Sequence, residues 1–289
     1  DEAISVVLSP EDDLLDLTLR VEKQGGIVFS RLNYRIAPDR TLRFALDLVP
    51  HAADWRSALA WMVSRYPQYF NPPNPAADAM AGTAAYSSYE GELDAAKYMK
   101  MSFRVNWKAS FDFPYMGMFL PPVANDTEKW PRFAPGETSV KQMNDYAQRM
   151  RDMGFYVFSY FNVTEFGTEI KGPETVNTNT PENELWKNAN NFLYRKIPDG
   201  ILYKEAGQGW GTCGGAIAMD PAGPAYQAHL LEQARRHVAE LPAASGVCID
   251  RLDWLRFYNP REDDGLSWRN GKAMRSLFQS WKGIISKLD

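Results

Sequence analysis

The chain has 289 residues, of which 45% are hydrophobic and 24% charged, and these fractions are ordinary for a globular protein. It carries 32 basic and 36 acidic residues, and the formal net charge of −4 argues against a dedicated nucleic-acid binder. No run approaches the roughly 18 apolar residues of a membrane-spanning helix, so we expect no membrane partner. Aromatic residues make up 13% of the chain, and such rings serve a core or stack on sugars and bases.

Cysteine and histidine do not indicate a metal centre. Cys213 and Cys248 form neither a disulfide framework nor a zinc motif. The three histidines (His51, His229 and His237) lack metal-ligand spacing, and the last two lie among Glu, Gln and Arg, which predicts a solvated helix face. We therefore expect no metal and no cofactor. The first residue is Asp1 rather than Met, so we expect a processed or partial chain.

Residues 1–53 read as antiparallel strands. Apolar or alternating runs occur at residues 3–8, 16–21, 26–36 and 41–49, with a Pro-Asp turn before the last run. Period-two alternation broken by turn residues is typical of antiparallel sheet. Four strands without a clear beginning predict the end of a β-sandwich domain.

Residues 54–81 predict a helix and an extended linker. Asp54 can cap a helix over residues 55–65, and a Pro- and Asn-rich stretch follows.

From residue 82 to residue 289, strands alternate with helices. We expect strands at residues 82–88, 115–120, 155–163 and 246–249. The expected helices cover residues 92–101, 138–153, 220–240 and 272–288. Repeated strand–helix units predict a parallel sheet with right-handed crossovers.

Four such units make half of an eightfold barrel or a small open sheet. Long loops rich in Trp, Tyr, Asn, Asp and Glu favour the barrel, and no dinucleotide or phosphate-binding glycine motif is present. The predicted fold class is α/β: the N-terminal half of a (β/α)8 TIM-type barrel, preceded by β-strands of a sandwich.

Asp250 is the candidate nucleophile. In the segment Val247-Cys248-Ile249-Asp250, alternation directs Val247 and Ile249 toward helices and Cys248 and Asp250 into the barrel. Asp250 then lies at the carboxyl-terminal mouth, where barrel enzymes place their chemistry. The alternative is a carboxylate that only pairs with Arg251 or Arg256.

Further residues at predicted strand ends are candidates for substrate binding. Asn162 shares strand parity with Tyr156, Phe158 and Tyr160, and Glu165 follows the same strand. Asp112 lies among aromatic residues that could raise its pKa. Ordinary core packing or a solvated loop is the alternative for each. The whole candidate set consists of Asp253, Arg251, Trp254, Trp107, Asp112, Asn162, Glu165 and Trp210.

Three segments resemble the catalytic barrel of glycoside hydrolases. They are DWRSALAWMVSRYPQYFNPP (54–73), NWKASFDFPYMGMFLPP (106–122) and the segment from MDPAGPAY to GVCIDRLDW (219–254). The chain is similar there to large bacterial polysaccharide-degrading proteins of the α-galactosidase-like and endo-α-N-acetylgalactosaminidase-like type, which combine a sandwich with a barrel. The resemblance implies a retaining enzyme acting on α-linked sugars, with Asp250 at the position of the nucleophile that ends the fourth strand.

The resemblance also has a consequence for the acid/base carboxylate. In those enzymes it comes from the sixth strand, whereas four strand–helix units are expected here. We therefore expect the missing barrel half, or a second subunit, to complete the site. An extracellular or periplasmic location follows from the enzyme class alone. A non-catalytic carbohydrate-binding protein, or an inactive fragment that requires a partner chain, remains the alternative.

Overall fold

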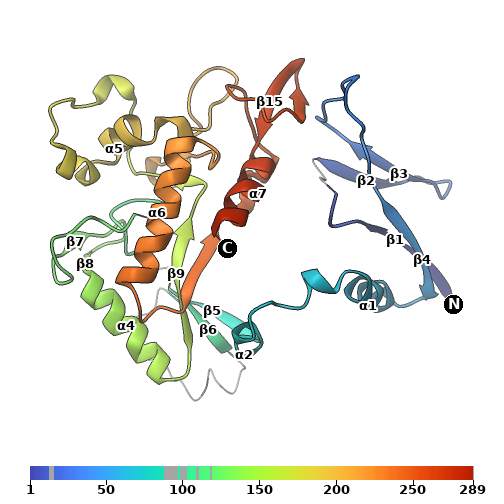
Figure 1. Ribbon diagram of the computed structural model, residues 1–289, viewed down its shortest axis with the longest axis horizontal. Helices are drawn as coiled ribbons and strands as arrows, with labels where there is room; N and C mark the ends of the chain where they lie inside the picture. The colour runs from blue at the N-terminus through green and yellow to red at the C-terminus, as the bar shows by residue number, and fades with distance from the viewer. Residues whose placement is uncertain (13–15, 88–96, 98–102, 109–110, 118, 289) are drawn as a thin grey trace. The chain divides into compact units, whose positions relative to one another are not determined.

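The computed structural model describes residues 1–12, 16–87, 97, 103–108, 111–117 and 119–288 (Figure 1). The chain divides into two compact units. The N-terminal unit comprises residues 1–81 with 268–270, and the larger unit comprises residues 82–267 with 271–289. The predicted helix at residues 92–101 lies outside the described residues.

The N-terminal unit is built from two antiparallel strand pairs. Strand β1 (Glu2–Leu8) pairs with β4 (Leu46–Ala52), and β2 (Leu17–Val21) pairs with β3 (Ile27–Arg31). The four antiparallel strands predicted from the alternation are thus confirmed.

A helical segment follows these strands. Helix α1 spans Trp55–Arg65 and begins at Asp54, whose side chain accepts a hydrogen bond from the Arg56 backbone N–H. The predicted capping by Asp54 is confirmed. Two short helical turns, η1 (Pro67–Tyr69) and α2 (Ala76–Ala79), complete this segment.

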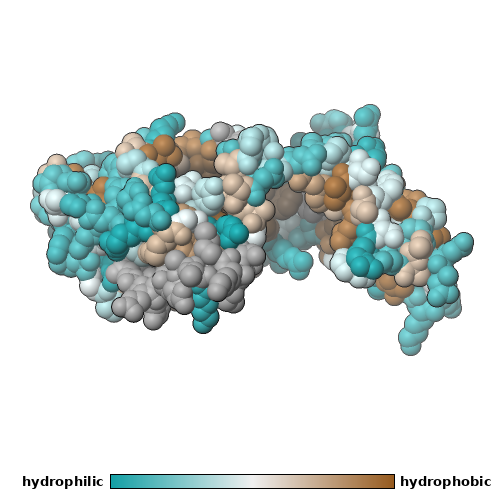
Figure 2. All heavy atoms as spheres, turned by 90° about the horizontal axis from the view of Figure 1, so that it is seen from below, coloured by the Kyte–Doolittle hydropathy of each residue, from teal (hydrophilic) through white to brown (hydrophobic). Residues whose placement is uncertain are grey.

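The N-terminal unit leaves many apolar side chains exposed. Figure 2 shows hydrophobic residues on its surface, and in β1, β2 and β4 they include Ile4, Val21 and Leu48, each more than 60% exposed. Of its described hydrophobic residues, only Val7, Val49 and Tyr66 are buried. A pair of two-stranded sheets therefore buries little apolar surface by itself.

The larger unit contains a four-stranded parallel sheet in the order β12-β9-β6-β5. Its strands are β5 (Thr83–Ser87), β6 (Phe103–Lys108), β9 (Tyr156–Asn162) and β12 (Gly246–Asp250). All three strand pairs are parallel, which confirms the predicted parallel sheet. Strands β5 and β12 are the two edges of this sheet.

The predicted strand at residues 115–120 is wrong. Strand β6 occupies Phe103–Lys108 instead, where Phe103, Val105 and Trp107 alternate with polar residues. The apolar run at 115–120 is buried irregular chain in its described part, and Gly117 has a φ of +101°, a left-handed conformation incompatible with a regular strand. The segment is apolar because it is buried, and not because it forms a strand.

Three longer helices belong to the larger unit. Helix α4 (Val140–Asp152) begins at Ser139 and precedes β9, while α6 (Pro224–Glu240) precedes β12. The Asn144 side chain of α4 donates a 2.8 Å hydrogen bond to the Glu240 carbonyl at the end of α6. The last predicted helix, at residues 272–288, is in part a strand: β15 covers Lys272–Ser276 and α7 covers Leu277–Leu288.

The chain between β9 and α6 forms an elaborate loop region. It contains helix α5 (Ala189–Lys196) and the antiparallel pair β10 (Glu165–Phe166) with β11 (Ile217–Ala218). Its short helical turns are η2 (Pro173–Thr175), η3 (Glu182–Lys187), η4 (Pro198–Gly200) and η5 (Cys213–Gly215).

The remaining elements are short. Strand β7 (Trp130–Pro131) pairs with β8 (Glu137–Thr138) in the loop after β6. After β12 come η6 (Leu252–Arg256), β13 (Tyr258–Asn259), which pairs with β15, and β14 (Ser267–Arg269).

The main core lies where β9, α5, α6 and α7 meet. It includes the buried residues Phe161, Leu193, Leu230 and Trp281. Val247 and Ile249 of β12 pack against this core, so the opposite face of the sheet carries their neighbours Cys248 and Asp250. Among the described residues, no helix is long and apolar enough to cross a bilayer.

His229 and His237 are not solvated, contrary to the expectation from sequence. His237 on α6 is 3% exposed, and its ring contacts Phe113 and Phe161. His229 packs among the rings of Phe119 and Phe192. Burial, assisted by the positive charge of Arg236, lowers the pKa of each histidine to about 4.

Candidate active site

The carboxyl ends of β9 and β12 bring two candidate residues together. In the parallel register Asp250 lies beside Asn162, and Cys248 lies beside Tyr160. Asp250 is half-buried, so its carboxylate retains access to solvent. A carboxylate at this end of a parallel strand is in the position that α/β enzymes use for chemistry.

Tyr160 is the direct neighbour of Asp250. Its hydroxyl accepts a 3.1 Å hydrogen bond from the Asn162 amide and donates to Met116 Sδ at 3.9 Å. Burial raises the pKa of Tyr160, and the negative charge of Asp250 raises it further. Tyr160 therefore stays protonated and serves as a neutral hydrogen-bond donor.

Asn162 holds the turn that follows β9. Its Oδ1 accepts from the backbone N–H groups of Thr164 and Glu165, each at 3.0 Å. Its Nδ2 donates to Glu165 Oε2 at 2.7 Å and to the Tyr160 hydroxyl. These bonds occupy the amide fully, so Asn162 orients Tyr160 and Glu165 rather than facing solvent.

Glu165 is completely buried. Its Oε1 lies 3.6 Å from Nη2 of Arg251, the residue that follows Asp250. A buried carboxylate is costly unless it is paired and hydrogen-bonded, and Asn162 and Arg251 supply that compensation. Glu165 thus anchors Arg251 beneath the site.

Arg251 adopts a left-handed backbone conformation, with φ +69° and ψ +63°. This conformation is unfavourable for a residue with a long side chain and often marks a functional turn. The Thr164 hydroxyl donates a 2.8 Å hydrogen bond to the Arg251 carbonyl and thereby fixes the turn. The Arg251 guanidinium also lies 2.7 Å from Asp253 Oδ2, and Asp253 is exposed.

The three candidate tryptophans fall into two groups. Trp107 stacks on Tyr160, with ring centroids 6.1 Å apart and planes at 11°. Trp210 and Trp254 instead pack on Phe257, with centroid distances of 4.8 and 5.1 Å. Trp254 is connected to the site through Arg251, whose guanidinium lies 5.9 Å from the ring. Trp107 is therefore the tryptophan that contacts Tyr160, and Trp254 is the one that contacts Arg251.

Asp112 belongs to a buried ion pair. Its Oδ2 lies 2.9 Å from Lys108 Nζ, and its Oδ1 lies 3.4 Å from Arg132 Nη1. The Lys108 ammonium also lies 4.2 Å from the centre of the Tyr146 ring on α4. Lys108 alternates with Trp107 in β6, so this pair lies on the helix-covered face, away from Asp250.

Tyr160 is the functional neighbour that sequence reasoning did not select as a site residue. The sequence did contain a signal for it: Tyr160 and Asn162 are two residues apart in the run FYVFSYFNV, so their side chains lie on the same face of the strand. No set of three or more His, Cys, Asp or Glu side chains in the described part of the chain could hold a metal ion.

Comparisons with known proteins give only remote similarity. No protein-family description matches the chain, and no curated protein sequence is similar to it. Among solved structures, it is similar to a cycloisomaltooligosaccharide glucanotransferase of Paenibacillus sp., with 10% identity and a TM-score of 0.45. The alignment covers 73% of this chain and 28% of the glucanotransferase.

Two further structures show a weaker likeness. One is the glycoside hydrolase domain of PelA from Pseudomonas aeruginosa, at 14% identity and TM-score 0.37, covering 71% of this chain and 54% of that one. The other is the maltogenic α-amylase AmyB from Thermotoga neapolitana, at 14% identity and TM-score 0.34, covering 58% and 38%. The chain therefore spans 28%, 54% and 38% of the length of these three structures.

Proposed function

We propose that this chain carries the nucleophile of a carbohydrate-active enzyme, a retaining glycoside hydrolase, and that the nucleophile is Asp250. The observation that carries the proposal is the half-buried Asp250 at the end of a parallel strand, close enough to Tyr160 for its negative charge to raise the pKa of that hydroxyl. The half-buried Trp107 ring, which stacks on the buried Tyr160, supplies a flat apolar surface of the kind that sugars stack on. The resemblance of the segment ending in GVCIDRLDW to α-galactosidase-like barrels supports the same assignment.

The chemistry has two steps. Asp250 forms a bond to the anomeric carbon while the bond to the leaving oxygen breaks, and a general acid protonates that oxygen. Water then cleaves the glycosyl–enzyme ester, and the same acid, now a base, takes the proton. Tyr160 keeps Asp250 oriented, and the Arg251–Glu165 pair fixes the turn behind it.

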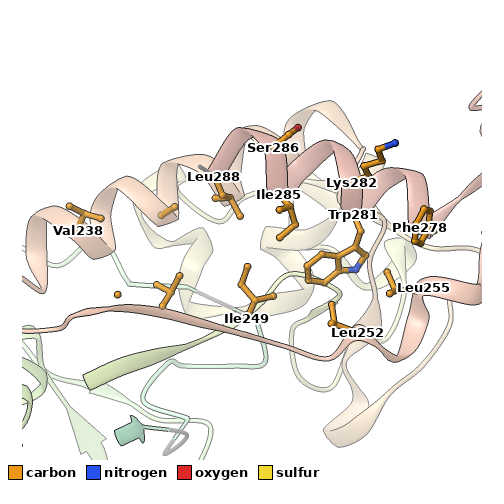
Figure 3. Close-up of a pocket in the computed structure, with 13 residues that line it drawn as sticks. Val238, Ile249, Leu252, Leu255, Phe278, Trp281, Lys282, Ile285, Ser286 and Leu288 are labelled. Carbon is orange, nitrogen blue, oxygen red and sulfur yellow. The ribbon is translucent and has the colours of Figure 1, made fainter. Parts of the chain in front are cut away.

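We also propose that the four-stranded parallel sheet belongs to the N-terminal half of a (β/α)8 barrel, and that residues 1–53 are part of a sandwich. An open apolar groove beside β12 supports it (Figure 3). This groove, of about 820 Å³, lies between α6, β12, η6 and α7, and Trp281 and Ile285 face Ile249 across it. A fifth strand and its helix, from the same protein or from a second subunit, would cover such a surface.

One observation favours a different function, non-catalytic carbohydrate binding. A retaining pair requires two carboxyl groups about 5–5.5 Å apart. Glu165, the other carboxylate of the cluster, is fully buried and held by Asn162 and Arg251, so it is unsuited to donate a proton to a leaving group. The general acid must come from another part of the barrel, and without it the site would bind sugars only. In either case we place the protein outside the cytoplasm, in keeping with a polysaccharide substrate.

Hydrolysis of a panel of aryl α-glycosides, measured beside binding of the corresponding free sugars, separates the two functions. An enzyme hydrolyses at least one member, and Asp250→Asn abolishes turnover while retaining binding. Asp253→Asn is the matched control, since Asp253 is exposed and contacts only Arg251 among the groups of this site. Sugar binding without hydrolysis would support the binding function instead.

A further inference from the structure

The amide of Asn162 has an orientation that the backbone fixes. Its Oδ1 accepts hydrogen bonds from the backbone N–H groups of Thr164 and Glu165, each at 3.0 Å. A backbone N–H can only donate, so the atom that faces these two groups must be the amide oxygen. The turn after β9 thereby determines where the NH2 group of Asn162 points.

That NH2 group has two hydrogens, and both form hydrogen bonds. One is donated to Glu165 Oε2 at 2.7 Å, and the other is donated to the Tyr160 hydroxyl at 3.1 Å. The Tyr160 oxygen therefore accepts from Asn162. Since a phenolic hydroxyl has one hydrogen, Tyr160 donates that hydrogen to a different group.

Two acceptors of unequal strength lie close to the Tyr160 hydroxyl. Met116 Sδ lies 3.9 Å from it, and a thioether is a weak acceptor. Asp250 lies on the same face of the sheet, because Tyr160 is opposite Cys248 in the neighbouring strand and Asp250 follows Cys248 by two residues. Burial and then the negative charge of Asp250 raise the pKa of Tyr160. A carboxylate is a much stronger acceptor than a thioether.

The aromatic neighbours of Tyr160 hold its hydroxyl in place. Tyr160 is 3% exposed; Trp107 stacks on its ring, and the Phe111 ring lies 5.1 Å away between centroids. The hydroxyl hydrogen can still rotate about the C–O bond, so it changes acceptor without any movement of the ring. A donor fixed in this way requires little reorganisation when charge develops beside it.

We propose that Tyr160 is a positioning residue whose hydroxyl changes acceptor during the reaction, a role that rests on the proposed function of Asp250. In the free chain solvent reaches the half-buried Asp250, and the hydroxyl donates to Met116. A bound sugar excludes solvent, and the hydroxyl then donates to the charged Asp250 carboxylate. When Asp250 becomes an ester its charge is lost, and the hydroxyl donates to Met116 again.

This exchange favours the second step of the reaction over the first. In the second step water attacks the anomeric carbon and gives its proton to the general base. The bond between that carbon and the Asp250 oxygen breaks, and its electron pair remains on the carboxylate. The hydrogen bond from Tyr160 strengthens as this charge develops and so accelerates deglycosylation. In the first step the same bond weakens, so the hydroxyl slows glycosylation.

Tyr160→Phe tests the proposal by separating the two steps. The variant keeps the ring and removes the donor, so the ratio of the glycosylation rate constant to the deglycosylation rate constant should rise about 10- to 100-fold, the worth of a hydrogen bond to a charged group. A residue that only packs or orients would slow both steps, and an unchanged ratio would overturn the proposal.

The probes are α-glucosyl fluoride and α-galactosyl fluoride, with added azide as the attacking nucleophile. Fluoride leaves without a protein acid and azide attacks without a base, so both steps proceed on this chain alone. Pre-steady-state release of fluoride gives the two rate constants. A wild-type chain that cleaves neither probe, or full turnover in Asp250→Asn, would instead overturn the proposed function and the role of Tyr160 with it.

Two further variants complete the experiment. Met116→Leu removes the weaker acceptor and should lower the ratio about two- to fivefold, which tests the exchange even if Tyr160→Phe does not fold. Tyr146→Phe is the matched control, because its hydroxyl bonds to Asn106 Oδ1 on the helix-covered face of β6, and it should leave the ratio unchanged. An unchanged or raised ratio in Met116→Leu, or equal shifts in the two tyrosine variants, would refute the exchange.

Discussion

Asp250 and Asn162 lie side by side at the carboxyl ends of two adjacent parallel strands. The Asn162 amide donates to the Tyr160 hydroxyl, and the negative charge of Asp250 raises the pKa of that hydroxyl. Asn162 in turn fixes Glu165, which pairs with Arg251, the residue after Asp250. One continuous polar network therefore determines the geometry around the proposed nucleophile.

Trp107 and Trp210 provide a matched comparison for sugar stacking. Replacing Trp107 by Leu removes the ring that stacks on Tyr160 and should weaken sugar binding by about 0.5–1.5 kcal/mol, the worth of an aromatic contact, which is roughly two- to tenfold in affinity. Trp210→Leu acts on the separate group around Phe257 and should leave affinity nearly unchanged. Equal losses in both variants, measured by titration with the bound sugar, would refute the assignment to Trp107.

Asp112 should matter for stability and not for activity. Asp112→Asn leaves the Lys108 ammonium buried with reduced compensation, and breaking a buried ion pair costs about 3–5 kcal/mol. Chemical denaturation measures this loss. The double variant Lys108→Met with Asp112→Leu should recover part of it, because the buried ammonium is removed together with its partner, while Arg132 keeps its hydrogen bond to the Pro135 carbonyl. If Asp112→Asn were fully stable but impaired in turnover, Asp112 would have a role in substrate binding after all.

His237 should make the protein sensitive to acid. Its pKa is lowered by burial from 6.5 to about 4, so the unfolded chain binds a proton that the folded chain resists. This contribution to stability is complete above pH 6.5 and is lost as the pH falls from about 6.5 toward 4. At pH 4 the loss of unfolding free energy amounts to about 3 kcal/mol.

Unfolding measured from pH 7 to pH 4 tests this contribution. His237→Phe keeps an aromatic ring between Phe113 and Phe161 and should remove about half of the acid dependence, because His229 has the same lowered pKa. His51→Gln is the control, because His51 lies in β4 of the N-terminal unit and is only half-buried. A slope that persists unchanged in His237→Phe would assign the acid sensitivity to other groups.

The apolar groove beside β12 should make the isolated chain self-associate and bind hydrophobic dyes. Ile285 lines it and is 42% exposed, and Val238 is 78% exposed. Ile285→Lys should lower the fluorescence of a bound hydrophobic dye and reduce self-association seen by light scattering. Lys287→Ile is the control, because it makes the opposite replacement on the same helix at a residue that does not line the groove. A chain that binds no dye and stays monomeric without any substitution would contradict an uncovered groove.

Local patterns predicted much of this fold. Alternation identified β9 and β12, and the cap at Asp54 and the apolar stripe from Val140 to Met150 identified α1 and α4. The apolar run at residues 115–120 misled because a buried loop and a buried strand have the same composition. The prediction that His237 is solvated was wrong because it relied on the charged neighbours in sequence. The spatial neighbours of His237 are Phe113 and Phe161, which only tertiary packing brings close.

The site was partly predictable for the same reason. Strand parity placed Asp250 and Asn162 on one face, since side chains alternate in any strand. It did not separate Trp107 from Trp210 and Trp254, because all three were expected in loops at strand ends, whereas Trp107 lies within β6. Asp112 pairs with Lys108, only four residues earlier in the sequence, but its second partner, Arg132, is twenty residues away in the loop after β6, and no local pattern indicates that contact.

The most direct test of the account is covalent trapping of the nucleophile. An activated, fluorine-substituted glycoside of the preferred sugar forms a glycosyl–enzyme that hydrolyses slowly, and peptide mass spectrometry locates it. The account predicts one sugar per chain on the peptide that contains Asp250, and none in Asp250→Asn. A label on Asp253 or Glu165, or on any other residue while Asp250→Asn retains full turnover, would contradict it.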